Sequence, residues 1–211
     1  MEIVQSIEKR GGGIYLVTFR NGVSIRMPAP VLRTFRLNVG DTLDIDAYWR
    51  DHHKEIYRFA IDLAVFLLSG KDYSRKMLQD RLARAGYPAF IVEEVLHFMH
   101  ERGYLDDARF AERIVEQKAK TMGENRIRQY LAQKGIDREI TQDLLEEKVD
   151  DDQQLTCAVK HIEKYLKSRA GQEKRRLYGN AIGMLARKGF SFELANRAYH
   201  IAEESAENPD N

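Results

Sequence analysis

The stretch Leu-Ala-Arg-Ala-Gly-Tyr at residues 82–87 occurs twice more in related form, as Leu-Ala-Gln-Lys-Gly-Ile at residues 131–136 and as Leu-Ala-Arg-Lys-Gly-Phe at residues 185–190. Each copy begins with Leu-Ala, has Gly four positions after the Leu, and continues with a large apolar residue. Apolar residues then recur at matching positions up to residues 96, 145 and 199. The copies begin 49 and then 54 residues apart. Self-similarity at such a period is typical of a repeat protein.

The glycine of each copy predicts a sharp turn between two helices. A helix that ends at Leu-Ala can be followed by a left-handed glycine, where a Cβ atom would clash. Two positions after each glycine stands a residue suited to begin a helix, namely Pro88, Asp137 or Ser191. An apolar helix is also expected before each pair, at residues 59–68, 110–119 and 158–166. The unit is therefore a three-helix repeat of roughly fifty residues, which needs docked neighbours to bury a sufficient core.

The N-terminal residues have a different pattern. The dipeptide Asn21-Gly22 is a strong signal for a two-residue hairpin, and it stands between β-branched and aromatic stretches at residues 14–20 and 23–27. Residues 3–7 and 42–45 are expected to add strands, and residues 31–37 a short helix. We therefore predict a mainly α fold, with three tandem three-helix repeats in an elongated array after a small β-rich module. The predicted domains are residues 1–46 for the module, 47–106, 107–150 and 151–205 for the repeats, and 206–211 for a disordered tail.

The composition is that of a globular protein. Of the 211 residues, 43% are hydrophobic, which is enough for a core. No run approaches the ~18 apolar residues of a membrane helix, and no signal peptide is recognisable, so we expect a cytoplasmic protein without membrane contact. The single cysteine, Cys157, excludes an intrachain disulfide and fits a reducing compartment. We interpret it as a small apolar residue on a helix rather than a reactive thiol.

Charge is balanced overall but unevenly distributed. The formal net charge is +1. Residues 160–188 hold nine Lys or Arg against two acids, whereas residues 137–152 hold eight acids against two basic residues. This asymmetry indicates either a surface with one face for phosphate or an acidic protein, or simply solvated helix faces. The sequence leaves both interpretations open.

No constellation typical of catalysis or cofactor binding can be assembled. The glycines at residues 11–13 are not followed by the Gly-Lys-Ser/Thr of a phosphate loop. His97 and His100 have the spacing of half a di-metal helix, but the second Glu-x-x-His element is absent. Asp106 and Asp107 have no neighbouring nucleophile, and capping of the next helix explains them. We therefore predict no enzyme activity, no metal and no cofactor.

Three stretches carry a family resemblance. They are Gly-Tyr-Leu-Asp-Asp-Ala-Arg-Phe-Ala at residues 103–111, Gly-x-x-Arg-Ile-Arg-x-x-Leu-x-x-Lys-Gly-Ile at residues 123–136, and Arg-Lys-Gly-Phe at residues 187–190. With the threefold helical repeat, they resemble the RecX family of bacterial regulatory proteins over about residues 55–204. The β-rich start is similar to the N-terminal extension of some members. The third repeat departs from the family's spacing in a longer loop before Lys174.

The resemblance implies a non-enzymatic, monomeric regulator in DNA repair, recombination and the SOS response. Such proteins bind the RecA recombinase and its filament on single-stranded DNA along the helical groove. They limit strand exchange, ATP hydrolysis and repressor self-cleavage, although some members promote recombination, so the direction of regulation stays open. A weak direct contact with DNA is also left open.

Basic side chains of the second and third repeats are the candidate partner-binding residues, because clustered Arg and Lys can bind both carboxylate and phosphate. The alternative is a helix-turn-helix transcriptional regulator, whose second helix would enter the major groove. Against it, residues 140–148 carry three acids that phosphate would repel. The candidate residues are Arg126, Arg128, Lys134, Arg175, Arg176, Arg187, Lys188, Lys118 and Lys120.

Overall fold

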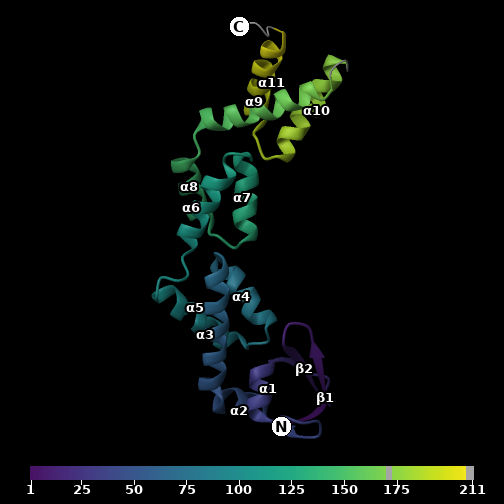
Figure 1. The fold of residues 1–211 in the computed structure, drawn as a ribbon, viewed down its shortest axis with the longest axis vertical. Helices are drawn as coiled ribbons and strands as arrows, with labels where there is room; N and C mark the ends of the chain where they lie inside the picture. The colour runs from purple at the N-terminus through teal and green to yellow at the C-terminus, as the bar shows by residue number, and fades with distance from the viewer. Residues whose placement is uncertain (170–172, 208–211) are drawn as a thin grey trace. The chain divides into compact units, whose positions relative to one another are not determined.

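The computed structural model describes residues 1–169 and 173–207, and it is mainly helical (Figure 1). Over these residues it has eleven helices and a small antiparallel sheet, which confirms the predicted mainly α fold with a β-rich start. The chain forms two compact units, at residues 1–106 and 107–211, which we call the N-terminal and C-terminal units. No described helix is long and apolar enough to cross a membrane.

Four strands form the sheet at the start of the N-terminal unit. They are β1 (Glu2–Arg10), β2 (Ile14–Phe19), β3 (Ser24–Pro28) and β4 (Thr42–Leu43), in the order β3-β2-β1-β4. The predicted hairpin joins β2 to β3, and Gly22 at its turn has a φ of 86°. The short helix predicted here is α1 (Ala29–Phe35). The last strand is shorter than predicted because Asp44 caps the next helix, α2 (Ile45–Asp51).

The sheet and the first repeat share one hydrophobic core. The repeat consists of α3 (His53–Gly70), α4 (Arg75–Arg84) and α5 (Ala89–Glu101). Phe19 and Met27 of the sheet belong to the same buried cluster as Ile56 and Leu82 of the helices. The turn after α4 touches the sheet directly, because a Cβ atom placed on Gly86 would lie 2.1 Å from the carbonyl oxygen of Arg26. Backbone contact therefore fixes the sheet against the first repeat.

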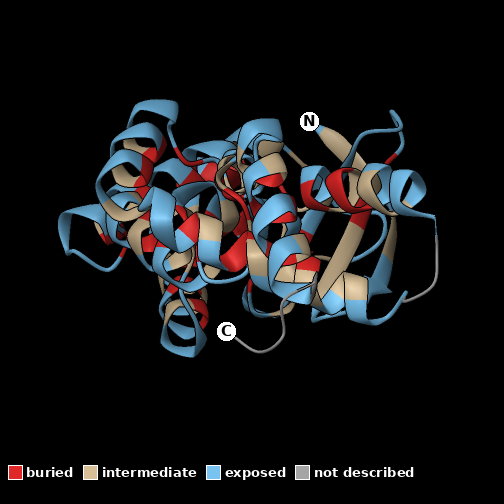
Figure 2. Cartoon of the chain, turned by 90° about the horizontal axis from the view of Figure 1, so that it is seen from above, coloured by how far each residue is buried: buried red, intermediate tan, exposed pale blue. Residues whose placement is uncertain are grey.

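The C-terminal unit holds the second and third repeats. The second consists of α6 (Asp107–Lys118), α7 (Glu124–Gln133) and α8 (Arg138–Lys148). The third consists of α9 (Asp151–Lys167), α10 (Lys174–Arg187) and α11 (Phe192–Glu207). Leu131 is fully buried in the second repeat, and Ile162 and Leu185 are fully buried in the third. Figure 2 shows that buried residues occupy only some faces of the helices, as expected for amphipathic elements.

The predicted helix–turn–helix chemistry is confirmed in the three copies. Gly86, Gly135 and Gly189 have φ angles of 97°, 78° and 93°, in the left-handed region. The Asp137 carboxylate accepts a hydrogen bond of 2.7 Å from an amide in the first turn of α8. The Ser191 hydroxyl accepts one of 3.2 Å at the start of α11. Local sequence thus determines where these helices end and begin.

Of the two residues after Gly103, Leu105 is buried and Tyr104 is 61% exposed. One expectation about the end of the chain differs from the structure. The tail was expected from residue 206, whereas α11 continues to Glu207. The remaining tail residues, 208–211, lie outside the described part of the chain, as do residues 170–172 of the loop before Lys174.

Candidate functional site

A main-chain joint connects the second and third repeats within the C-terminal unit. The Gly123 amide donates a hydrogen bond of 3.0 Å to the Lys188 carbonyl, and the Asn125 amide donates one of 3.1 Å to the Gly189 carbonyl. A Cβ atom on Gly123 would lie only 2.2 Å from the carbonyl carbon of Gly189. The glycine turn of the third repeat therefore rests directly on the start of α7. We call this contact the joint.

Helix α9 reinforces the joint from the other side. The Gln154 side-chain amide donates hydrogen bonds of 3.1 and 3.2 Å to the carbonyls of Ala119 and Met122, in the loop between α6 and α7. The Cys157 thiol lies 3.3 Å from the Lys120 carbonyl. Gln154 is 4% exposed, so its amide is removed from water and needs these acceptors. The two repeats are thus held together by buried polar contacts as well as by backbone.

The joint gathers basic side chains that are distant in sequence. A Cβ atom on Gly189 would lie 2.4 Å from the Cβ atom of Arg126, so Arg126 stands directly beside the turn that carries Arg187 and Lys188. Arg126 and Arg187 are exposed and Lys188 is half-buried. Within the described residues, none of the three has an ion pair. We call Arg126, Arg187 and Lys188 the joint cluster.

Two further lysines lie nearby but are partly compensated. Lys120 and Lys160 line a groove of about 480 Å³ between the α6–α7 loop and α9. Asp150 and Asp152 line the same groove, so the charges there balance. Lys160 was not among the predicted site residues, although it lies at the start of the basic run of residues 160–188. The excess positive charge at the joint therefore belongs to the joint cluster.

Three other predicted residues make internal contacts. Arg128 forms an ion pair with Glu124 and donates a hydrogen bond of 3.0 Å to the Gln142 side chain of α8. Lys118 and Lys134 lie on the Tyr130 ring, with their Nζ atoms 4.3 and 5.2 Å from its centroid. These are favourable cation–π distances. Arg128 braces α7 against α8, and both lysines pack on the repeat's own surface, so these three are less available than the joint cluster.

Arg175 and Arg176 lie at the opposite end of α10 from the joint. Both are exposed in its first turn, which contains no acid. Cations at a helix N-terminus are unfavourable because that end carries partial positive charge.

The two basic regions of the third repeat are well separated. With a rise of about 1.5 Å per residue, the twelve positions from Arg175 to Arg187 place them about 18 Å apart along α10. The third repeat therefore presents two separate basic regions.

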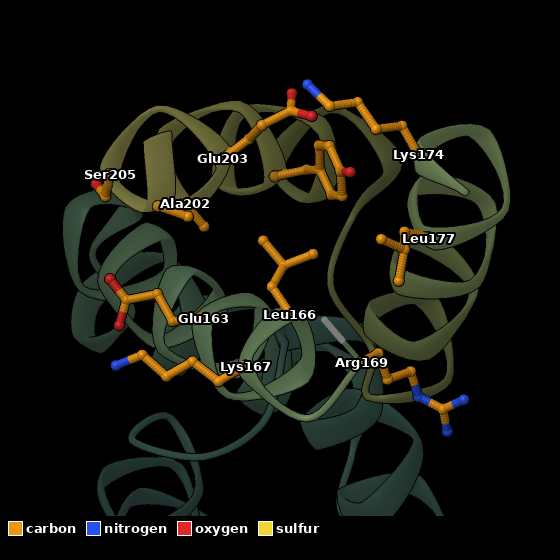
Figure 3. A pocket seen from close by; sticks show the side chains of 11 residues that line it. Glu163, Leu166, Lys167, Arg169, Lys174, Leu177, Ala202, Glu203 and Ser205 are labelled. Atoms are coloured by element: carbon orange, nitrogen blue, oxygen red, sulfur yellow. The ribbon is translucent and has the colours of Figure 1, made fainter. Parts of the chain in front are cut away.

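An apolar pocket with a charged rim lies beside the first turn of α10. It has a volume of about 440 Å³ and is walled by α9, α10 and α11. Figure 3 shows Leu166 pointing into the opening and the charged ends of Lys167 and Arg169 turned outward. Glu163 and Glu203 also line it, so its rim is of mixed sign. Sequence reasoning missed this pocket because its walls come from three helices.

Cys157 gives a test of the packing at the joint. Burial raises the pKa of its thiol above the ordinary value, and the positive charges of Lys188 and Lys160 oppose this only in part. A raised pKa means less thiolate, the form that reacts. We expect Ellman's reagent at about pH 8 to label Cys157 at least ten-fold more slowly in the native chain than in guanidinium-unfolded chain. Equal labelling rates would show that the α6–α7 loop does not cover the thiol.

Comparison with known proteins identifies these repeats. Models of the first, second and third three-helix domains of RecX match residues 60–99, 106–145 and 151–199. The regulatory protein RecX of Vibrio vulnificus (strain CMCP6) is 34% identical over 145 residues, which are 68% of this chain and 92% of that protein. The regulatory protein RecX of Bacillus licheniformis is 33% identical over 186 residues, covering 85% of this chain and 68% of that protein.

Solved structures agree on the fold. A crystal structure of regulatory protein RecX superposes with a TM-score of 0.66 at 24% identity, covering 97% of this chain and 100% of that one. A crystal structure of RecX from Lactobacillus salivarius gives a TM-score of 0.66 at 22% identity, covering 72% of this chain and 99% of that one. With three domain matches in order along the sequence, the chain belongs to the RecX family of regulatory proteins.

Proposed function

We propose that this protein binds the RecA recombinase and its filament on single-stranded DNA, and that it restrains the ATPase, strand-exchange and coprotease activities of that filament without being an enzyme itself. Membership in a family of regulatory proteins supports the regulatory role. The observation that carries the surface assignment is the main-chain joint, which holds Arg126 beside the turn of Arg187 and Lys188.

A preformed basic surface suits this role energetically. The joint fixes the backbone under the cluster, so binding orders only the side chains. The loss of conformational entropy on binding is therefore smaller than for a flexible loop, whose backbone would also have to be ordered. A nucleoprotein filament presents carboxylates and phosphates together, and an arginine can bind either group through two hydrogen bonds. A protein that contacts adjacent filament subunits and prefers one of their arrangements shifts the filament toward it. Such a shift would slow the cycle of ATP hydrolysis.

We rank the candidate residues for this proposal by their exposure and internal contacts. The joint cluster comes first, because its charges are accessible and lack ion pairs among the described residues. Arg175 and Arg176 are proposed as a second contact, next to the apolar pocket of the third repeat. The remaining candidates make internal contacts or have balanced charge, and we expect smaller effects from them. They are Lys118, Lys120, Arg128 and Lys134.

The double variant Arg126→Glu/Arg187→Glu is expected to weaken binding to the recombinase filament by at least about ten-fold. Loss of even one charge-assisted hydrogen bond costs about 1.5 kcal/mol or more, and the new carboxylates add repulsion. The measurement is a titration of the filament's ATP hydrolysis, together with binding to the filament on single-stranded DNA. Undiminished inhibition by the double variant would remove the joint cluster from the interface.

The control is Arg138→Glu, which makes one such charge reversal at the exposed first position of α8. It should inhibit like the unmodified chain. Arg128→Glu is a poor probe, because it places a second carboxylate beside Glu124 and removes the brace between α7 and α8. The whole proposal fails if the unmodified chain neither binds the host recombinase nor changes its ATP hydrolysis at equimolar protein.

The helix-turn-helix alternative predicts that the second helix after a glycine turn enters the DNA major groove. In the second repeat this helix is α8, where Asp143, Glu146 and Glu147 are exposed. Phosphates on either side of the groove would repel these carboxylates. Tight binding to one duplex sequence, with strong preference over random duplex, would favour this alternative instead.

A further inference from the structure

A further basic region lies in the N-terminal unit, which holds none of the residues assigned above. A cleft of about 620 Å³ opens between the glycine loop of residues 11–13, helix α1 and the helices α3 and α4. This volume is in the range of small-ligand sites. We call it the arginine cleft. Residues that line it include Gly13, Arg33, Phe59, Asp62, Arg81 and Arg84.

Three arginines converge on this cleft from two helices. Arg81 and Arg84 are three apart on α4 and so share one face of the helix, and Arg33 comes from α1. Asp62 is the single carboxylate in the lining, so three positive charges face one negative charge. Over residues 1–169 and 173–207, the three arginines have no ion pair. The cleft therefore has an excess of positive charge available to an anion.

The rest of the lining is apolar. Phe59 and Leu63 of α3 are half-buried, with part of each side chain open to the cleft. Tyr87 is buried, and this burial, with the negative charge of Asp62, raises the pKa of its phenol well above the ordinary value, so it stays neutral. A ligand that fits such a lining has an anionic group at one end and a flat or apolar body at the other.

We propose that the arginine cleft binds a nucleotide unit of single-stranded DNA. Arg81 and Arg84, with Arg33, receive the phosphate, and the base packs against Phe59 and Leu63. The Asp62 carboxylate favours a base over the acidic side chain of a peptide, because a base offers N–H donors whereas a second carboxylate would be repelled. The glycine loop leaves room for the strand, since the positions of Cβ atoms on Gly11, Gly12 and Gly13 meet no atom within 4 Å.

This inference deepens the proposed function by adding a direct contact with the DNA of the filament. It does not require the recombinase to be the partner, because the strand itself is the ligand. The test is therefore made with the full chain and DNA alone, so that a failure to bind the recombinase would not decide it. The probe is a fluorescein-labelled oligothymidylate, followed by fluorescence anisotropy at about 50 mM salt, where phosphate contacts are strong.

The double variant Arg81→Glu/Arg84→Glu is expected to raise the dissociation constant for the oligothymidylate at least ten-fold. Because each phosphate contact to a single strand contributes about 0.7 to the slope of log K against log salt, losing two should reduce that slope by about 1.4. The control, Lys76→Glu, makes one such charge reversal on an exposed residue of the same helix outside the cleft, and should bind like the unmodified chain.

Circular dichroism checks that the double variant folds; if it does not, Arg81→Gln/Arg84→Gln replaces it with the same expected loss. Unchanged affinity and salt slope in a folded variant would overturn the proposal. A hexaglutamate peptide that displaces the oligothymidylate at equal or lower concentration would also overturn it, by assigning the cleft to a carboxylate partner. Displacement only at far higher peptide concentration supports the nucleotide.

Discussion

Replacing Gly123 with alanine is expected to lower the free energy of unfolding of the C-terminal unit by about 3 kcal/mol. The φ of Gly123 is −74°, which any residue adopts, so backbone strain contributes nothing. The new Cβ atom would instead lie 2.2 Å from both the carbonyl carbon of Gly189 and the amide nitrogen of Phe190. Both obstacles are main-chain atoms, which cannot rotate away, so the joint must open.

Urea unfolding followed by far-ultraviolet circular dichroism measures this loss. The matched control is Gly179→Ala in α10, where the added Cβ atom meets nothing within 4 Å. That change should stabilise by about 0.5–1 kcal/mol, because alanine favours a helix interior. The single tryptophan, Trp49, is buried in the N-terminal unit, so its fluorescence should be unaffected by either change. A Gly123→Ala transition at or above the midpoint of the unmodified chain would contradict the joint.

The second large effect is expected for Gly86→Ala, at about 4 kcal/mol in the N-terminal unit. Two costs combine here. The φ of 97° is unfavourable for a residue with a side chain, and the Cβ atom would lie 2.1 Å from the Arg26 carbonyl oxygen of β3. The sheet would have to move away from the turn after α4. Trp49 fluorescence during urea unfolding measures the change, because Trp49 belongs to the core shared by sheet and helices.

Gly103→Ala separates these two costs. Gly103 also ends a helix and has a φ of 70°, but its Cβ position is open. We expect it to lose only about 1 kcal/mol, from backbone strain alone. If Gly86→Ala and Gly103→Ala destabilise equally, then the contact with β3 contributes nothing and the sheet does not depend on that turn.

The helices, their caps and the hairpin could be predicted from the sequence because they depend on neighbouring residues. The left-handed φ of Gly135 and the cap formed by Asp137 are two positions apart, and their spacing alone indicates the turn. The family resemblance rested on the same short-range features. The β-rich module could be predicted for the same reason, from Asn21-Gly22 and its flanking residues.

The candidate site could be predicted only in part, because it depends on distant contacts. The local sequence around Gly123 gives no sign that it touches the turn of Gly189, so the grouping of Arg126 with Lys188 was not predictable. The pairing of Arg128 with Glu124, in contrast, was visible as an i, i+4 spacing of opposite charges. Sequence reasoning counted the positive charge of Arg128 and overlooked its partner.

The arginine cleft illustrates the same limit. The cleft combines Arg33 of the N-terminal module with Arg81 and Arg84 of the first repeat. These positions come together only because α1 and α4 pack around one core. Charge counting within a single segment cannot find a site that two segments share.

The joint is made of peptide groups, and this has a consequence for how the surface can be altered. The amides of Gly123 and Asn125 and the carbonyls of Lys188 and Gly189 are backbone atoms, present with any side chain at position 188 and with any except proline at position 125. Only the two glycines are constrained by lack of space. The residues around the joint can therefore be redesigned as a set, as in a grafted binding loop, while the alignment of the two repeats is preserved. The backbone of the joint thus fixes the shape of this surface, whereas the side chains around it determine its charge and hydrogen bonding.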